Sequence, residues 1–139
     1  MTADDVIQEL YLDGVMVPAL PNASIFDVPD SVVLPSTTNV IAVLVKNTNG
    51  PGAGYGGLLA SDTTGRIISD STWKCSNVNS SGWMNVNFND SSWKNAALLF
   101  NNSGSTIYQP IPGIRPEAWW IWNSEKSLDL YVYLRLRFS

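Results

Sequence analysis

The chemistry open to this chain is limited first by the side chains that it lacks. It contains no histidine and a single cysteine, Cys75, which excludes Ser-His-Asp and Cys-His nucleophile arrangements and zinc sites of the usual kinds. A carboxylate pair for glycoside hydrolysis remains, since twelve acidic residues are present. Most of these, such as Asp13, Asp62, Asp70 and Asp90, stand in turn sequences where an aspartate bonds the local backbone. We therefore expect no catalysis.

A second set of side chains fits the binding of a sugar. Sugars present hydroxyls to planar polar groups and C–H faces to aromatic rings, so such a site needs an aromatic platform beside polar side chains on rigid loops. Trp83 is the first candidate for the platform, with a lid over one end of the core as its alternative role. On the platform interpretation, Trp83→Ala removes glycan binding and leaves the fold intact. The predicted ligand-binding residues are Trp83, Tyr55, Arg66, Lys74, Arg115, Glu117 and Trp119.

Bound metal is weighed separately. Asp27 and Asp30, or Asp4 and Asp5, could join backbone carbonyls around a calcium ion. No EF-hand or other ligand spacing is present, and solvated surface acids explain both pairs. We expect no cofactor and no metal at the site; a calcium ion, if bound, would be structural, and an unchanged melting temperature after chelation would exclude it.

The elements that must position these residues are organised around two near copies of one pentapeptide, DSTWK at residues 70–74 and DSSWK at residues 90–94. An Asp-Ser pair directly before a large aromatic favours a tight corner, in which side-chain oxygens bond the local backbone and the indole turns inward. Because tryptophan buries a large area, Trp73 and Trp93 are predicted to be core side chains.

The rest of the chain has the pattern of short strands separated by turns. Residues 6–12 and 15–17 flank Asp13-Gly14, a pair that favours a tight hairpin. Residues 40–45 form an unbroken apolar run typical of a buried central strand. Strict alternation over residues 128–138 predicts one strand face in the core and the other in water. Shorter strands or extended pieces are expected at 23–28, 31–34, 65–69, 96–100, 105–109 and 118–122.

One motif in this pattern argues for a different class of protein and is rejected. Gly52, Gly54 and Gly57 form a G-x-G-x-x-G sequence after a strand, but no helical sequence follows to face a dinucleotide. A loop between strands explains the glycines. With no helical periodicity elsewhere, the sequence predicts one all-β sandwich or barrel domain over residues 1–139.

Charge and apolar runs limit the partners. The net charge is −4 and the basic residues are scattered along the chain, so the sequence shows no basic cluster that would bind the phosphates of nucleic acid. The longest apolar run is too short to insert into a membrane. We expect an extracellular, secreted protein whose signal is not present in this chain. Four N-x-[ST] acceptor sequences support that setting, and they begin at Asn22, Asn79, Asn89 and Asn101.

Seven motifs follow one another along the chain: ELYLDG (9–14), VIAV (40–43), GGLLA (56–60), WKCS (73–76), GW (82–83), FNDSSW (88–93) and AWWIW (118–122). Their order resembles that of the galactose-binding-domain-like jelly rolls. Such domains occur as lectin-like modules of extracellular proteins and as accessory domains of glycoside hydrolases. The resemblance implies an antiparallel jelly-roll β-sandwich, and it covers nearly the whole chain.

Three functions remain open. The leading hypothesis is a non-catalytic, carbohydrate-binding lectin-like module for glycan recognition or adhesion, with glycans or glycoconjugates as partners. A homo-oligomer would suit it, because a weak single site gains from multivalency. The second is a structural or matrix protein that self-associates, for which large exposed aromatic patches would be evidence. The third is an accessory domain of a glycoside hydrolase.

Overall fold

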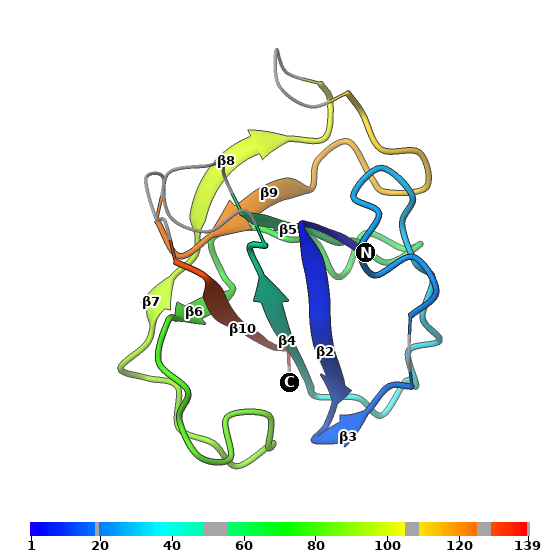
Figure 1. The fold of residues 1–139 in the computed structure, drawn as a ribbon. Helices are drawn as coiled ribbons and strands as arrows, with labels where there is room; N and C mark the ends of the chain where they lie inside the picture. Colours follow the sequence, from blue (N-terminus) through cyan, green and yellow to red (C-terminus); the bar gives the residue numbers. More distant parts are fainter. Residues whose placement is uncertain (19, 49–55, 105–108, 125–128, 139) are drawn as a thin grey trace.

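The computed structural model describes residues 1–18, 20–48, 56–104, 109–124 and 129–138. Over these residues the chain forms ten β-strands and no helix, in two antiparallel sheets packed as a sandwich (Figure 1). In spatial order, the smaller sheet contains β1 (Thr2–Asp4), β5 (Gly57–Leu59), β9 (Trp119–Trp122) and β8 (Ala97–Asn101). The larger contains β3 (Val15–Met16), β2 (Val6–Leu12), β4 (Val40–Lys46), β10 (Tyr131–Arg137), β6 (Lys74–Ser76) and β7 (Lys94–Asn95).

The predicted all-β class is therefore confirmed, as an antiparallel two-sheet sandwich. Figure 1 shows β8 and β9 running across the strands of the larger sheet. A search of the described residues finds no helix that could span a membrane.

The predicted opening hairpin and central strand are both confirmed. β2 and β3 pair across Asp13-Gly14, whose φ angles are 49° and 83°. Two consecutive positive φ angles are what a two-residue hairpin turn of this hand requires. β4 pairs with β2 on one side and β10 on the other, and Val40 to Val45 are all buried. This strand is the centre of the larger sheet.

The main core lies between the sheets, where aliphatic side chains of the larger sheet meet those of the smaller one. It includes Val43 of β4, Leu134 of β10, and Leu58 and Ile121 of the smaller sheet. The thiol of Cys75 is buried in the same core, and this burial raises its pKa. A buried thiol with a raised pKa is a poor nucleophile, so this environment makes Cys75 unreactive.

The outer face of β10 differs from its prediction. Tyr133 and Arg135 belong to the polar half of the alternation, yet they are 7% and 0% exposed. The loop between β6 and β7 covers them and brings Trp83 and Trp93 into a second apolar cluster on this face, with Tyr133. Alternation identifies the side chains that share a face, but it does not show whether another segment covers that face.

The burial of Tyr11 on this covered face predicts that the stability of the protein depends on pH in the alkaline range. Tyr11 donates a hydrogen bond to Glu9 Oε2 at 2.8 Å. Burial, together with this bond and the charge of Glu9, raises the pKa of Tyr11 from 10.0 to about 12. The unfolded chain then loses the phenol proton first, so the free energy of unfolding should fall between pH 10 and 12. Urea titrations across this range should show the fall, and Tyr11→Phe should lessen it; an equal fall in the variant would contradict the assignment.

Both pentapeptides form tight turns, but the predicted side-chain bond to the local backbone is seen at Asp70, whose Oδ1 accepts the Thr72 N–H at 2.8 Å, whereas Asp90 Oδ2 accepts from Arg135. The N–H groups of Trp73 and Trp93 donate to the carbonyls of Asp70 and Asp90 at 3.3 and 3.0 Å. Each corner leads directly into a strand, and these strands, β6 and β7, pair with each other. Trp73 enters the core between the sheets, whereas Trp93 packs on the outer face. The two copies are thus neighbours in the larger sheet, but their tryptophans pack in different apolar clusters.

Three predicted extended pieces are not strands. Residues 23–28 form successive turns, residues 31–34 run without a ladder, and residues 65–69 contribute only a bridge between Ile68 and Ser61. Pro21, Pro29 and Pro35 flank the first two, which limits continuous pairing. Most of the predicted strand at 105–109 lies outside the described residues. Gly57 opens a strand rather than a helix, consistent with the rejected dinucleotide motif.

Candidate functional site

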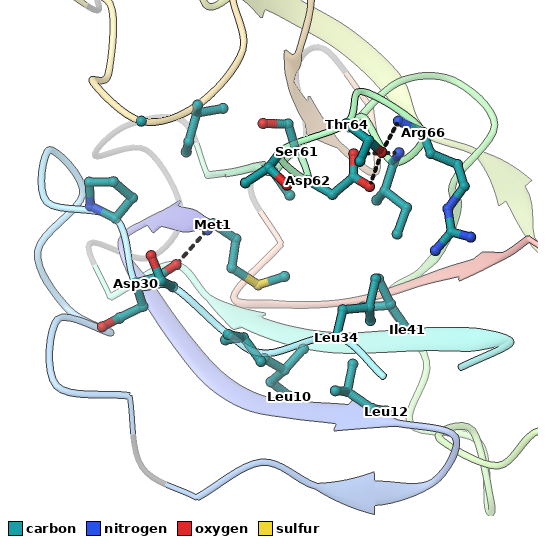
Figure 2. A pocket seen from close by; sticks show the side chains of 18 of the residues that line it. Met1, Leu10, Leu12, Asp30, Leu34, Ile41, Ser61, Asp62, Thr64 and Arg66 are labelled. Atoms are coloured by element: carbon teal, nitrogen blue, oxygen red, sulfur yellow. Dashed lines mark hydrogen bonds between the residues drawn. The ribbon is translucent and has the colours of Figure 1, made fainter. Parts of the chain in front are cut away.

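A cavity of about 640 Å³ opens between the two sheets, at the end where β2 finishes and β4 begins (Figure 2). The larger sheet forms one wall, and residues 60–67 form the facing wall. Residues 29–36, which make no strand, close one side. Residues 29–36 do not extend either sheet. This end of the sandwich is therefore not closed by paired strands, and the cavity opens there.

The interior of the cavity is apolar. Leu10 and Ile41 contribute from the larger sheet, Ile67 from the facing segment, and Trp73 from the corner before β6. All four are also part of the main core, with at most 4% of each residue exposed. The indole Nε1 of Trp73 donates to the Ile68 carbonyl at 3.0 Å, so its one donor is already used. This interior offers contact area and few hydrogen bonds.

One side of the rim is a polar turn held rigidly by its own hydrogen bonds. Asp62 accepts from the Thr64 hydroxyl at 2.7 Å and from the Ile67 N–H at 3.1 Å. Burial raises the pKa of Asp62, but these bonds and those from the N–H groups of Gly65 and Arg66 outweigh it and hold the pKa below its usual value. The carboxylate is therefore ionised at neutral pH and fixes the shape of the turn.

Arg66 is the cation on this rim. Its side chain is exposed, and its guanidinium lies 5.6 Å from the centre of the Phe138 ring. Within the described part of the chain no ion pair engages it. A guanidinium offers five N–H donors in a fixed plane. Arg66 can therefore bind a ligand at the mouth of the cavity without breaking an existing ion pair.

The opposite side of the rim holds an acid with a structural role. Asp30 is 5% exposed, and its two carboxylate oxygens accept the Asn22 N–H at 3.1 and 3.2 Å. Of the other acids considered for calcium, Asp5 accepts both the N–H and the hydroxyl of Thr48 at 2.9 Å. Among the described residues, no three metal-ligating side chains gather in one place.

Of the other predicted ligand-binding residues, Arg115 lies beside this rim and Glu117 pairs with it, although neither lines the cavity. Arg115 approaches the turn of Arg66, because its backbone N–H donates to Ser61 Oγ at 3.0 Å. Its side chain lies over Gly65, where a Cβ atom would stand 2.9 Å from the guanidinium Nε. Glu117 forms an ion pair with Arg115 at 3.4 Å. The side chains of this pair are 42% and 59% exposed, so solvent screens the pair.

Trp83 lies elsewhere and is buried. It is 3% exposed and packs edge-on against Tyr11 and Tyr133, with ring centres 5.6 and 4.9 Å away. Of its two predicted roles, this position fits the lid rather than the platform, although it covers the outer face of the larger sheet rather than an end of the sandwich. No face of this ring is left open for a sugar.

The remaining predicted residues do not join the rim. Lys74 donates to Asn95 Oδ1 at 2.7 Å, in the strand pair at the far edge of the larger sheet. Trp119 is half-buried, and its backbone N–H and carbonyl bond Ser69 at 2.9 and 2.6 Å. Tyr55 lies outside the described residues.

Sequence reasoning missed several residues of the site. Ser61 and Thr64 were not singled out, and Asp62 was interpreted only as a turn former. The composition of residues 61–65 did indicate a turn. Nothing in the sequence, however, places that turn across an opening from residues 29–36.

Comparison with protein-family models, with curated proteins and with solved structures finds no match to this chain. Its function must therefore be inferred from the side chains around the cavity.

Proposed function

We propose that this protein is a non-catalytic carbohydrate-binding module that recognises a glycan at the mouth of the cavity. The observation that carries this proposal is the exposed Arg66 guanidinium, without an ion pair in the described chain, beside a turn fixed by Asp62. A rigid rim with a planar donor group, hydroxyls and a carboxylate suits the paired hydroxyls of a sugar. Arg115 and Glu117 extend the same rim.

The position of the acids supports a binding role rather than hydrolysis. A glycosidase needs one carboxyl group to move a proton and a second to act as base or nucleophile. Here the carboxylates of Asp30 and Asp62 both accept backbone N–H groups that shape the rim. In this proposal the fold is a galactose-binding-like jelly roll, and the module works outside the cell in recognition or adhesion, as the sequence motifs and glycosylation acceptors suggest.

A glycan array with the labelled protein, run with calcium and with chelator, tests the proposal. Arg66→Ala should weaken binding about 10- to 100-fold, because a hydrogen bond to a charged donor contributes about 1.5–3 kcal/mol. Lys74→Ala is the matched control and should leave binding unchanged, since the Lys74 side chain bonds Asn95 and does not line the cavity. Specific signal on no glycan, or equal losses in the two variants, would contradict the site.

The structural alternative has one observation in its favour. Val15, Met16 and Val33 are 71%, 53% and 88% exposed around a second hollow beside the edge strand β3. Such a surface could bind a second copy. The exposed apolar side chains of the described chain are mainly aliphatic, however, and do not form the aromatic patches expected for this function. Sedimentation of the protein and of Val15→Glu over a range of concentrations would detect self-association through this surface.

A further inference from the structure

We infer that the glycan carries an apolar group, and that this group enters the cavity while the sugar stays at the rim. The ligand class is thus an amphipathic glycoside, such as a sugar linked to an alkyl chain. This inference rests on the proposed function, because it assigns the sugar to the rim around Arg66.

The division between rim and interior is the first reason. A sugar placed deep in the cavity would exchange water for Leu10, Ile41 and Ile67, which offer it no hydrogen bond. Unpaired buried hydroxyls are costly, so the depth of this cavity disfavours a sugar ring. Trp73 does not change this, since its only donor is bonded to the backbone. An alkyl or aryl group suffers no such loss.

The shape of the cavity is the second reason. A volume of about 640 Å³ lies within the usual range for small-molecule sites. The cavity can therefore hold a ligand group larger than a single amino-acid side chain. In Figure 2, Leu10, Leu34 and Ile41 lie across the hollow from Asp62, Thr64 and Arg66. A ligand that spans this opening therefore meets aliphatic side chains on one side and polar groups on the other. Only an amphipathic molecule satisfies both.

The length of the ligand's alkyl chain gives a quantitative test. Burial of one methylene group raises affinity about fourfold, from a transfer free energy of about 0.8 kcal/mol. We would measure binding of methyl, butyl and octyl β-D-galactopyranosides and β-D-glucopyranosides by calorimetry, below the concentrations at which they form micelles. Sodium octanoate serves as the probe that has the chain without the sugar. Affinity should rise from methyl to octyl for at least one of the two sugars.

Two neighbouring residues provide matched variants. Leu34 is half-buried and lines the cavity, whereas Val33 is 88% exposed and points to the other hollow. Leu34→Glu should remove the gain from chain length, because it puts a charge among the apolar walls. Val33→Glu should retain the gain. Thermal melts of both variants would establish that each is folded under the conditions of the titration.

The outcomes separate the two proposals. Equal affinity for methyl and octyl glycosides would overturn the apolar group in the cavity and leave the glycan site at the rim. Octanoate binding as tightly as the octyl glycosides, with no binding of methyl glycosides, would overturn the proposed function. No binding of any of the seven probes would overturn the inference, as would loss of the gain from chain length in Val33→Glu.

Discussion

Replacing Asp90 by alanine should lower the free energy of unfolding by about 3–5 kcal/mol, whereas the same change at Asp70 should cost only about 1 kcal/mol. The two aspartates hold the same position in the two pentapeptides and accept the same turn hydrogen bond. Asp90 differs because its Oδ2 also accepts a hydrogen bond from Arg135 Nε at 2.9 Å. Without it, no other anion of the described residues balances the fully buried guanidinium.

The surroundings of Arg135 explain why this loss should be large. Its side chain is 0% exposed, and besides Asp90 it donates to the carbonyls of Trp83 and Asn85. Its guanidinium also lies 5.2 Å from the centre of the Phe88 ring. Arg135 therefore holds the 83–90 segment against the outer face of the larger sheet, and Asp90 keeps that buried charge neutralised.

Urea unfolding of the two variants and of the parent protein gives the comparison. The turn hydrogen bond is accepted by a main-chain carbonyl and is kept in both variants. Asp70→Ala removes bonds from Thr72, whereas Asp90→Ala removes the anion beside Arg135, so a larger loss at Asp90 reports the buried charge. Equal losses at the two positions would show that the charge of Arg135 is balanced in another way.

The second large effect is expected at Trp83. Truncation to alanine should lower the free energy of unfolding by about 3–5 kcal/mol, because it empties the space between Tyr11 and Tyr133. This reverses the expectation from the sequence, in which the same change leaves the fold intact and removes glycan binding. Trp83→Phe keeps part of the ring contact and should lose less stability.

Stability and binding measured on the same variants decide between the two roles. On the structure, the folded fraction of Trp83→Phe binds glycans as the parent protein does, since the ring is remote from the cavity. Unchanged stability of Trp83→Ala together with lost binding would restore Trp83 as the sugar platform.

The parts of this fold that follow from the sequence depend on local physics. The hairpin at residues 13 and 14 follows because Asp and Gly are among the few residue types that adopt a positive φ angle. The first corner follows from Asp70, whose side chain bonds the backbone two residues further on. The buried run at residues 40–45 needs only its composition to predict a central strand. For the same reason the all-β class was predictable before any pairing was known.

The candidate site shows the limit of such reasoning. Arg66, Arg115 and Glu117 were identified by residue type and loop context; Arg66 lines the cavity, Arg115 lies beside the turn of Arg66, and Glu117 pairs with Arg115. Their juxtaposition was not predictable, because it depends on a contact between segments about 50 residues apart, from Arg115 to Ser61. The residue type alone also favoured Lys74, which bonds Asn95 at the other edge of the sheet.

By itself, then, the sequence determined the strands, the turns and the alternation of faces, because these depend on steric limits and periodicity within a few residues. Only the tertiary structure decided which faces are covered and where the sandwich stays open. Burial of Arg135 and Trp83 depends on the path of the loop over residues 77–93, and the cavity depends on residues 29–36 failing to pair. Such outcomes depend on long-range packing, which no local pattern encodes.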